Sequence, residues 1–453
     1  MKLSFLGATA TVTGSKYLIE DGETKILIDC GLFQGRKELR QRNWANLPLN
    51  PAALDAVILT HAHIDHSGYI PRLVKQGFRG KIYCSEATYD LCSILLPDSG
   101  YIQEEDARRA NKYGYSRHEK AEPLYNQKEA RAALGYFQPV KFDEFFNIGN
   151  KLKIILKRSG HILGSSFIKI DDGKKTIVFS GDLGRPNDPV MVDPMSIESA
   201  DYLVVESTYG NRLHDKSAPE DMIGEIIVST AAKGGTVVIP AFAVGRVQSL
   251  LYYIQKLKQK EKIPNIPVFL DSPMAINASK LLCKHKKEHR FSEKMCHKVC
   301  DVATYTRTVE DSKKLDTAHA MPSVIISASG MATGGRVLHH LKTYIGDSKN
   351  TILFTGYQAG GTRGDRLVRG EKEIKIHGQM WPVRARIECM SNTSAHADYQ
   401  EMLDWLGYFK KSPTKVFVTH GEVEAAASLK EKIEEKFGWT VTVPAYQDWE
   451  ELS

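Results

Sequence analysis

The sequence predicts an α/β fold in which short buried strands alternate with helices. Short aliphatic runs recur along the chain, as at 56–60 (AVILT) and 236–240 (TVVIP), and such runs are typical of buried strands. A stretch with helical periodicity follows the second of them at 245–260 (GRVQSLLYYIQKLKQK). Most of these runs lead into a polar turn that contains Gly or Ser. In α/β sheets, ligand sites collect where loops leave the carboxyl ends of strands, so we expect the functional residues in these turns.

The remaining elements follow from the same pattern. In chain order, the expected strands are 56–60, 176–179 (TIVF), 202–206 (YLVVE), 236–240, 323–327 (SVIIS), 351–355 (TILFT) and 415–419 (KVFVT). A second clear helix is expected at 424–438 (EAAASLKEKIEEKFG). Residues 97–138 are highly charged and helix-favouring, with Pro123 as a break, and form either a helical insertion over one domain or a solvated helical connector.

The composition is that of a globular protein. The chain has 453 residues, of which 42% are hydrophobic and 25% charged, and this length favours two domains. The net charge of +7 is compatible with a polyanionic partner, although many unrelated enzymes have the same balance. No stretch has the apolar length of a transmembrane helix, and the first residues do not form a signal peptide. We therefore expect no membrane association.

The cysteines predict a reducing environment. There are 7, an odd number, and no CxxC pair occurs, which favours free thiols in the cytoplasm over a disulfide framework. Cys296, His297 and Cys300 are close enough in sequence to suggest a metal clip. Because no second half accompanies it, one face of a helix is the plainer interpretation.

The stretch 59–68 (LTHAHIDHSG) is the strongest local signal. His61 and His63 are two residues apart after an expected strand, so in an extended loop their side chains point the same way, and imidazole suits zinc. Asp65 and His66 follow where the loop turns into a helix, in a position to face a second ion. Later turns add three more ligand-type residues: His161 in SGHILG, Asp182 in SGDLG and His420 in VTHGE. This repetition at strand ends predicts a metal site.

This combination of motifs resembles the metallo-β-lactamase superfamily. Glu206 in VVESTYG and His396 in TSAHADYQ, together with His420, are similar to the extra motifs of its β-CASP group of nucleic-acid hydrolases. IPAFAVGRVQ, DSPMA, SASGMATGGR and GYQAGGTRG look like signatures of the β-CASP domain, so the resemblance covers nearly the whole chain. The group includes the cleavage subunit of pre-mRNA 3′-end processing, whose bacterial and archaeal counterparts the chain resembles, and more distantly ribonuclease J. His420 stands where DNA-repair members typically have Val, which favours RNA.

The resemblance implies a fold and a domain organisation. The fold class is a metallo-β-lactamase four-layer αββα sandwich with an inserted α/β β-CASP domain. We expect the metallo-β-lactamase domain at 1–206 and 385–453 and the β-CASP domain at 207–384.

The resemblance also implies residue roles. His61, His63 and His161 would hold a first zinc, Asp65, His66 and His420 a second, and Asp182 would bridge them. A hydroxide between the ions would attack phosphorus. His396 would protonate the leaving oxygen, with Glu206 orienting its ring. The predicted catalytic residues are His396, Glu206, Asp65 and Asp182.

Glycine-rich turns followed by arginines suggest phosphate contacts. Backbone amides in a strand-to-helix turn can form a phosphate nest, although such a loop is more often just a turn. Guanidinium groups suit phosphate recognition. The candidate RNA phosphate-binding residues are Ser329, Gly330, Gly334, Gly335, Arg246, Arg336 and Arg363.

The predicted function is zinc-dependent hydrolysis of RNA phosphodiester bonds. We expect an endonuclease, with 5′→3′ exonuclease action as a second mode, two Zn²⁺ per chain (Mn²⁺ is the alternative), and single-stranded RNA as partner. A homodimer is an expectation from the family. Two other classes stay open: a small-molecule hydrolase of the same fold, acting on a thioester, lactone or lactam, and a non-catalytic RNA-binding subunit. The inserted domain and His396 argue against the first, and the complete ligand set argues against the second.

Overall fold

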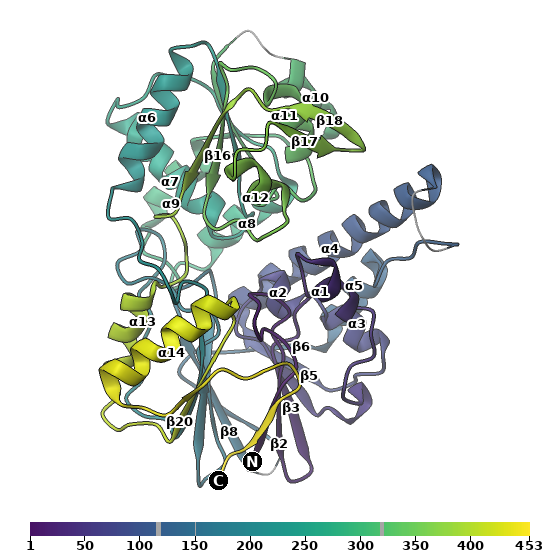
Figure 1. Cartoon of the computed structure of the whole chain (residues 1–453), viewed down its shortest axis with the longest axis vertical. Helices are drawn as coiled ribbons and strands as arrows, with labels where there is room; N and C mark the ends of the chain where they lie inside the picture. The colour runs from purple at the N-terminus through teal and green to yellow at the C-terminus, as the bar shows by residue number, and fades with distance from the viewer. Residues whose placement is uncertain (115–118, 150, 318–320) are drawn as a thin grey trace. The chain divides into compact units, whose positions relative to one another are not determined.

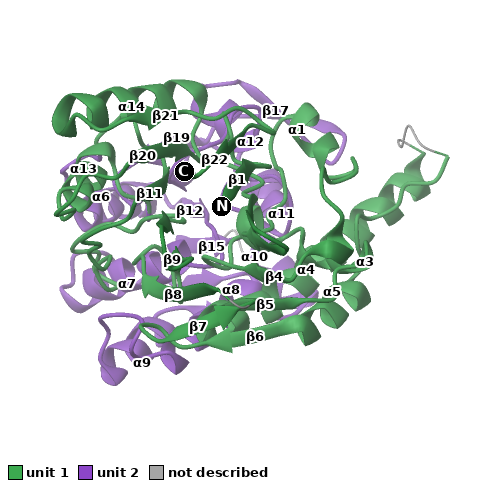
Figure 2. Cartoon of the chain, turned by 90° about the horizontal axis from the view of Figure 1, so that it is seen from below, with its two compact units in different colours: residues 1–213, 396–453 green, residues 214–395 purple. Residues whose placement is uncertain are grey.

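The chain divides into two compact units in a computed structural model that describes residues 1–114, 119–149, 151–317 and 321–453 (Figures 1 and 2). Unit 1 comprises Met1–Leu213 and His396–Ser453, and unit 2 comprises His214–Ala395. Unit 2 is thus inserted in the sequence of unit 1. The domain boundaries expected from the sequence, after residue 206 and before residue 385, are close to these limits and remain predictions.

Unit 1 contains the first and last strands of the chain. Its strands are β1 (Lys2–Phe5), β2 (Tyr17–Asp21), β3 (Thr24–Ile28), β4 (Ala56–Ile58), β5 (Lys81–Ser85), β6 (Phe137–Val140), β7 (Phe145–Ile148), β8 (Leu152–Arg158), β9 (Ser166–Asp171), β10 (Thr176–Phe179), β11 (Tyr202–Glu206), β20 (Lys415–Thr419), β21 (Val441–Thr442) and β22 (Trp449–Glu451). Its helices are α1 (Lys37–Arg42), α2 (Ile64–Ser67), α3 (Ile70–Lys75), α4 (Glu86–Tyr113), α5 (Gln127–Ala133), α13 (Tyr399–Leu406) and α14 (Val423–Phe437), with the 3₁₀ helices η1 (Pro51–Ala53) and η2 (Leu134–Tyr136).

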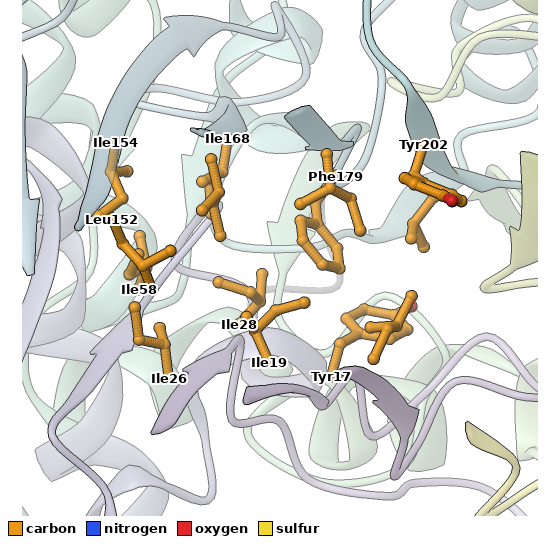
Figure 3. Close-up of a cluster of buried hydrophobic side chains, with 14 of the residues drawn as sticks. Tyr17, Ile19, Ile26, Ile28, Ile58, Leu152, Ile154, Ile168, Phe179 and Tyr202 are labelled. Atoms are coloured by element: carbon orange, nitrogen blue, oxygen red, sulfur yellow. The ribbon is translucent and has the colours of Figure 1, made fainter. Parts of the chain in front are cut away.

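Two sheets of unit 1 face each other across a hydrophobic core. Among the described residues, each sheet has seven strands, in the orders β22-β1-β2-β3-β4-β5-β6 and β21-β20-β11-β10-β9-β8-β7. Figure 3 shows Ile26 and Ile28 of the first sheet pointing toward Ile168 and Phe179 of the second. Burying such a side chain contributes about 1.5–3 kcal/mol, so this core is a main source of stability for unit 1.

Helices cover the outer faces of both sheets. Along β11, Tyr202 and Val204 point into the core between the sheets, whereas Leu203 and Val205 pack with residues of α13 and α14. This alternation is the period-two pattern of a strand buried on both faces. On the other sheet, α4 packs on β5 and β6. Unit 1 is therefore a four-layer αββα sandwich, as predicted.

Unit 2 is built around a parallel sheet. Its strands are β12 (Thr236–Pro240), β13 (Val268–Leu270), β14 (Thr304–Tyr305), β15 (Ser323–Ser327), β16 (Thr351–Thr355), β17 (Glu373–Ile376), β18 (Gln379–Pro382) and β19 (Arg386–Met390). Its helices are α6 (Pro219–Ala231), α7 (Arg246–Gln259), α8 (Pro273–Lys284), α9 (Glu293–Asp301), α10 (Val309–Thr317), α11 (Val337–Tyr344) and α12 (Arg363–Val368). Within the described part of the chain, the sheet order is β14-β13-β15-β12-β16-β19, and β17 and β18 form a separate hairpin.

The central strands of this sheet consist of nearly continuous apolar residues because both faces of the sheet are buried. Every residue of β12, β15 and β16 is buried. All pairings in the sheet are parallel, which is usual for strands buried on both faces in α/β proteins. The predicted inserted α/β domain is thus confirmed.

The predicted elements lie where the sequence placed them. The seven expected strands correspond to β4, β10, β11, β12, β15, β16 and β20, and the two expected helices to α7 and α14. The charged segment 97–138 is helical over much of its described part, as expected: it contains the second half of α4 and all of α5. Helix α4 begins before this segment, at Glu86, where Ser85 caps it by accepting a hydrogen bond from the amide of Thr88. Residues 115–118 of this segment lie outside the described residues. None of the described helices is long and apolar enough to cross a bilayer.

Candidate metal centre

The loop after β4 carries four of the predicted ligands. His61 follows the strand, His63 precedes α2, and Asp65 and His66 lie within that helix. His61 and His66 are buried, and the other two are partly exposed. The loop lies against the backbone of Gly31, where a Cβ atom would be 1.5 Å from the carbonyl oxygen of Asp65. A glycine at position 31 is therefore required to hold the loop in this place.

The first cluster joins His61, His63, His161 and Asp182, whose ligand atoms lie within 4.8 Å of one another. Nε2 of His61 is 3.0 Å, and Nε2 of His161 is 3.3 Å, from Nδ1 of His63. Burial lowers the pKa of His61 to about 3 and the pKa of His63 to about 4. Neutral imidazoles offer lone pairs, and three imidazoles with one carboxylate are a donor set that suits zinc.

The second cluster joins Asp65, His66 and His420. Nε2 of His66 lies 3.0 Å from Nε2 of His420, which in turn is 3.5 Å from Oδ2 of Asp65. His420 comes from the turn after β20, so this cluster unites the two ends of the chain. The donors again suit a divalent transition-metal ion.

Asp182 stands between the two clusters. Its Oδ2 lies 3.4 Å from Nε2 of His61, and its Oδ1 lies 3.3 Å from Nε2 of His66. Burial alone would raise the pKa of Asp182, but the facing histidines, His420 foremost, hold it well below its usual value. Oδ1 is buried without a hydrogen-bond partner. A buried carboxylate oxygen without a donor is costly unless a cation balances it, so the residues present fit a metal at both clusters.

A further carboxylate, Asp29, orients this centre. It follows β3, and its Oδ2 lies 2.7 Å from Nδ1 of His66. The amide of Thr60 donates to its Oδ1 at 2.8 Å. With Nδ1 held, the imidazole of His66 presents Nε2 to the cluster. Sequence reasoning missed Asp29; the signal available was an aspartate directly after the aliphatic run KILI.

His396 and Glu206 form a pair beside the first cluster. Nδ1 of His396 lies 3.0 Å from Oε2 of Glu206, a buried residue at the end of β11. The other carboxylate oxygen accepts from the amide of Leu183 at 2.6 Å, which fixes the carboxylate. The rings of His396 and His161 are 4.4 Å apart between centroids. Burial alone would lower the pKa of His396, but the carboxylates of Glu206 and Asp182 raise it to about 9.

The candidate phosphate-binding residues all belong to unit 2, where several already have partners. Oγ of Ser329 accepts from the amide of Gly334 at 3.4 Å. Arg336 donates to Oδ1 of Asp271 at 2.6 Å, and Arg363 donates to the carbonyl oxygens of Lys375, Ala332 and Thr333. Gly330 is packed against Phe242 and Gly335 has a φ of +80°, while Arg246 begins α7. A role in RNA binding for these residues remains a prediction.

A four-layer αββα unit with adjoining His/Asp clusters at its strand ends defines a metal-dependent hydrolase of the metallo-β-lactamase type. Residues 11–218 match the Metallo-beta-lactamase superfamily, residues 247–367 the Beta-Casp domain, and residues 380–444 the Zn-dependent metallo-hydrolase RNA specificity domain. The chain belongs to the β-CASP family of metallo-hydrolases.

Curated relatives extend over nearly the whole chain. Ribonuclease TTHA0252 of Thermus thermophilus is 34% identical over 438 residues, which cover 95% of each chain. Transcription termination factor FttA of Methanosarcina mazei is 31% identical over 467 residues, covering 96% of this chain and 69% of that protein. A solved protein of unknown function from Enterococcus faecalis V583 shares the fold, with a TM-score of 0.56 at 12% identity and 99% coverage of both chains.

Proposed function

We propose that this chain is a zinc-dependent ribonuclease that hydrolyses RNA phosphodiester bonds to 5′-phosphate and 3′-hydroxyl ends. The observation that carries the proposal is the pair of His/Asp clusters with Asp182 between them and His396 beside them. The match to an RNA specificity domain and the ribonuclease among the relatives support RNA as the substrate. Metal binding follows from the family; two zinc ions, with manganese as the alternative, are part of this proposal.

The two clusters would divide the work of holding metal. His61, His63 and His161 would hold one ion, and Asp65, His66 and His420 the other. Asp182 would serve both, which its geometry supports because it has one oxygen toward each cluster. Ions in these positions supply Lewis-acid polarisation of water and neutralise charge on the phosphate.

His396 would supply the proton that the leaving 3′ oxygen needs. An alkoxide is a poor leaving group, and a positioned acid typically contributes about 10²–10⁴-fold in rate. The carboxylate of Glu206, at 3.0 Å from Nδ1, favours the protonated ring of His396, and this protonated form would be the acid. Because Glu206 holds Nδ1, the acidic proton would be delivered from Nε2. Glu206 therefore acts as a positioning residue.

The partner of this protein is RNA. We further propose that this RNA is single-stranded, that the protein forms a homodimer and that it acts in the cytoplasm. All seven cysteines are free thiols, which suits a reducing compartment. Ser329, Gly330, Gly334, Gly335 and Arg246 are proposed contacts to RNA phosphates. Arg336 and Arg363 would have to exchange their present protein acceptors for phosphate.

The test is cleavage of one RNA labelled at either end in separate reactions, with a DNA strand of the same sequence. The protein should carry a counted amount of zinc, and His396→Ala and the exposed-histidine control His297→Ala are run in parallel. Discrete internal RNA fragments, absent with His396→Ala and present with His297→Ala, are expected. Mononucleotides from the 5′ end would assign exonuclease action instead. Zinc-loaded protein that cuts neither strand but hydrolyses a thioester or lactam would overturn the proposal.

A further inference from the structure

The positive charge of this chain is concentrated in unit 2. Residues 214–395 contain 27 lysines and arginines against 17 aspartates and glutamates, whereas unit 1 has 34 against 37. The excess is densest at 280–298 (KLLCKHKKEHRFSEKMCHK), where seven lysines and arginines accompany two glutamates. This segment comprises the second half of α8, the loop after it and most of α9 (Figure 1). We call it the basic surface.

The side chains of the basic surface are open to solvent. All seven lysines and arginines in it are exposed. Lys286 pairs with Glu293 at 3.1 Å. Within the described part of the chain, the lysines of this segment that make no ion pair are Lys280, Lys287, Lys294 and Lys298. The carboxylates of the protein therefore leave a large part of this charge unbalanced.

The spacing of the lysines adds repulsion along each helix. Lys280 and Lys284 are four residues apart on α8, and Lys294 and Lys298 are four residues apart on α9. Like charges at this spacing destabilise a helix by about 0.2–0.5 kcal/mol for each pair. Local electrostatics thus disfavour the arrangement, and an anionic partner would offset the repulsion.

The loop between α8 and α9 is held in place by buried groups. Nδ1 of His289 accepts from the amide of Phe291 at 3.0 Å, and Nε2 donates to the carbonyl oxygen of Leu282 at 2.8 Å. The ring of Phe291 stacks on that of Tyr252 of α7, with centroids 5.2 Å apart. A fixed backbone therefore presents the lysines, so binding to them does not have to order the loop.

The basic surface is distinct from the turns that carry the candidate phosphate-binding residues. Those turns follow the carboxyl ends of strands, and α8 begins just after β13 at the same edge of the sheet. Because β13 and β14 pair in parallel, the chain between them must return toward the amino ends of the strands. Helix α8 has 12 residues and is about 18 Å long, and the basic surface begins in its second half.

We propose that the basic surface binds the phosphate backbone of RNA, as a contact of unit 2 outside the hydrolytic centre. The inference rests on the proposed function, because the RNA held there is the RNA that is cut. Lysine is a point charge on a flexible stem, so it contacts phosphates without fixing a sequence. A long RNA held in this way has a raised effective concentration at the protein, while the chemical step is unchanged.

The test compares the wild type with Lys287→Glu/Lys294→Glu/Lys298→Glu on RNA of two lengths. Sites for single-stranded nucleic acid span about 4–16 nucleotides, so an RNA of about 5 nucleotides fills one site and an RNA of about 30 reaches a second. For the long RNA, KM should rise about tenfold at low salt while kcat stays the same. For the short RNA, both constants should equal those of the wild type.

The control is Lys81→Glu/Lys174→Glu/Lys411→Glu, which changes the net charge equally through exposed lysines of unit 1. It should leave KM for the long RNA within about twofold of the wild-type value, because non-contacting charges are largely screened. An equal rise of KM in both triple variants would show an effect of total charge. That result, or an unchanged KM in the test variant, would overturn the proposal.

A measurement on the wild-type protein decides the matter where a variant does not fold. An excess of the long RNA should protect Lys287, Lys294 and Lys298 from acetylation, followed by mass spectrometry, and should leave Lys174 reactive. Equal acetylation of all four lysines with and without RNA would contradict the basic surface. RNA cleavage is assayed on the same samples. Cleavage without protection sinks the basic surface alone, and protection without cleavage sinks the proposed function alone.

Discussion

At the scale of single residues, two carboxylates make the same kind of contact to histidines with different proposed roles. Asp29 and Glu206 each hold Nδ1 of a histidine, His66 and His396 respectively. His66 thereby turns Nε2 toward the cluster with Asp65 and His420, as its proposed role as a metal ligand requires. His396 stands beside its cluster, and the carboxylates of Glu206 and Asp182 raise its pKa to about 9. This shift is consistent with its proposed role as an acid. The surroundings of each ring, rather than the residue type, separate the two proposed roles.

Asp29→Ala is expected to weaken metal binding about 10–100-fold without removing a ligand, because loss of an outer hydrogen bond frees the ring of His66. Asp29→Asn should lose less zinc affinity than Asp29→Ala, since the amide oxygen of Asn still accepts a hydrogen bond from Nδ1 of His66. The measurement is zinc affinity by competition with a chelator. Equal affinity in Asp29→Ala and wild type would show that the contact does not orient the ligand.

His396→Ala should lose about 10²–10⁴-fold in RNA cleavage while both zinc ions remain bound. The loss should shrink to a few-fold on a phosphodiester with a p-nitrophenolate leaving group, which departs without protonation. Single-turnover rates on both substrates and metal content by mass spectrometry provide the check. Equal losses on both substrates would contradict a role as general acid, and loss of zinc would reveal a misassigned ligand.

At the scale of elements, a buried histidine joins a strand end to two helices of unit 2. Nε2 of His340 on α11 lies 2.7 Å from Oδ2 of Asp271, just after β13, and Nδ1 lies 2.8 Å from Oδ1 of Asp316 on α10. Burial alone would lower the pKa of His340, but the two carboxylates raise it to about 9. Arg336 donates to the same Asp271, so the network also positions the turn that precedes α11.

This network should make the stability of unit 2 depend on pH. The folded pKa of His340, about 9, lies above the unfolded value of 6.5, so its contribution is complete below pH 6.5 and is lost as the pH rises through 9. The difference corresponds to about 3 kcal/mol as an order of magnitude. The contribution of His340 to the free energy of unfolding is measured by calorimetry of the wild type and His340→Gln from pH 6 to 10.

The control is His297→Ala, which removes an exposed histidine of the same unit. The free energy of unfolding of this control should equal that of the wild type at every pH. The difference in free energy of unfolding between the wild type and His340→Gln should instead become smaller as the pH rises. A gap that stays constant across this range would show that His340 is neutral in the folded protein.

At the scale of the whole molecule, the net charge of +7 suits a polyanionic partner. RNA affinity should fall with salt, with a slope of log K against log salt of about −0.7 for each phosphate contacted. Fluorescence anisotropy of a labelled RNA bound to His396→Ala measures the slope without cleavage. A peptide nucleic acid of the same sequence, which has no phosphates, should bind weakly and show no slope. A flat response with RNA would exclude binding through the backbone.

The strands and ligands that could be predicted from the sequence are those that have a local signal in it. The strands β11, β12 and β16 were predictable because a short apolar run is enough to define a buried strand. His61, His63 and His66 could be grouped because they lie within one loop, and their spacing carries information about direction. The later ligands could be added by their repeated place at strand ends and by resemblance to a family, and their roles remain predictions.

The features that could not be predicted from the sequence depend on contacts between distant parts of the chain. His66 and His420 are 354 positions apart in the sequence, yet their Nε2 atoms lie 3.0 Å apart, because His66 follows a strand of one sheet of unit 1 and His420 a strand of the sheet packed against it. No local pattern encodes that distance. The contact between Asp29 and His66 likewise joins residues that are distant in the sequence. Cys283 likewise reaches Cys300 because two helices pack, not because of spacing in the sequence. The residue types along this chain specify which chemistry is available, and the packing of distant segments selects which side chains meet to perform it, because contact energies depend on separation in space and not along the chain.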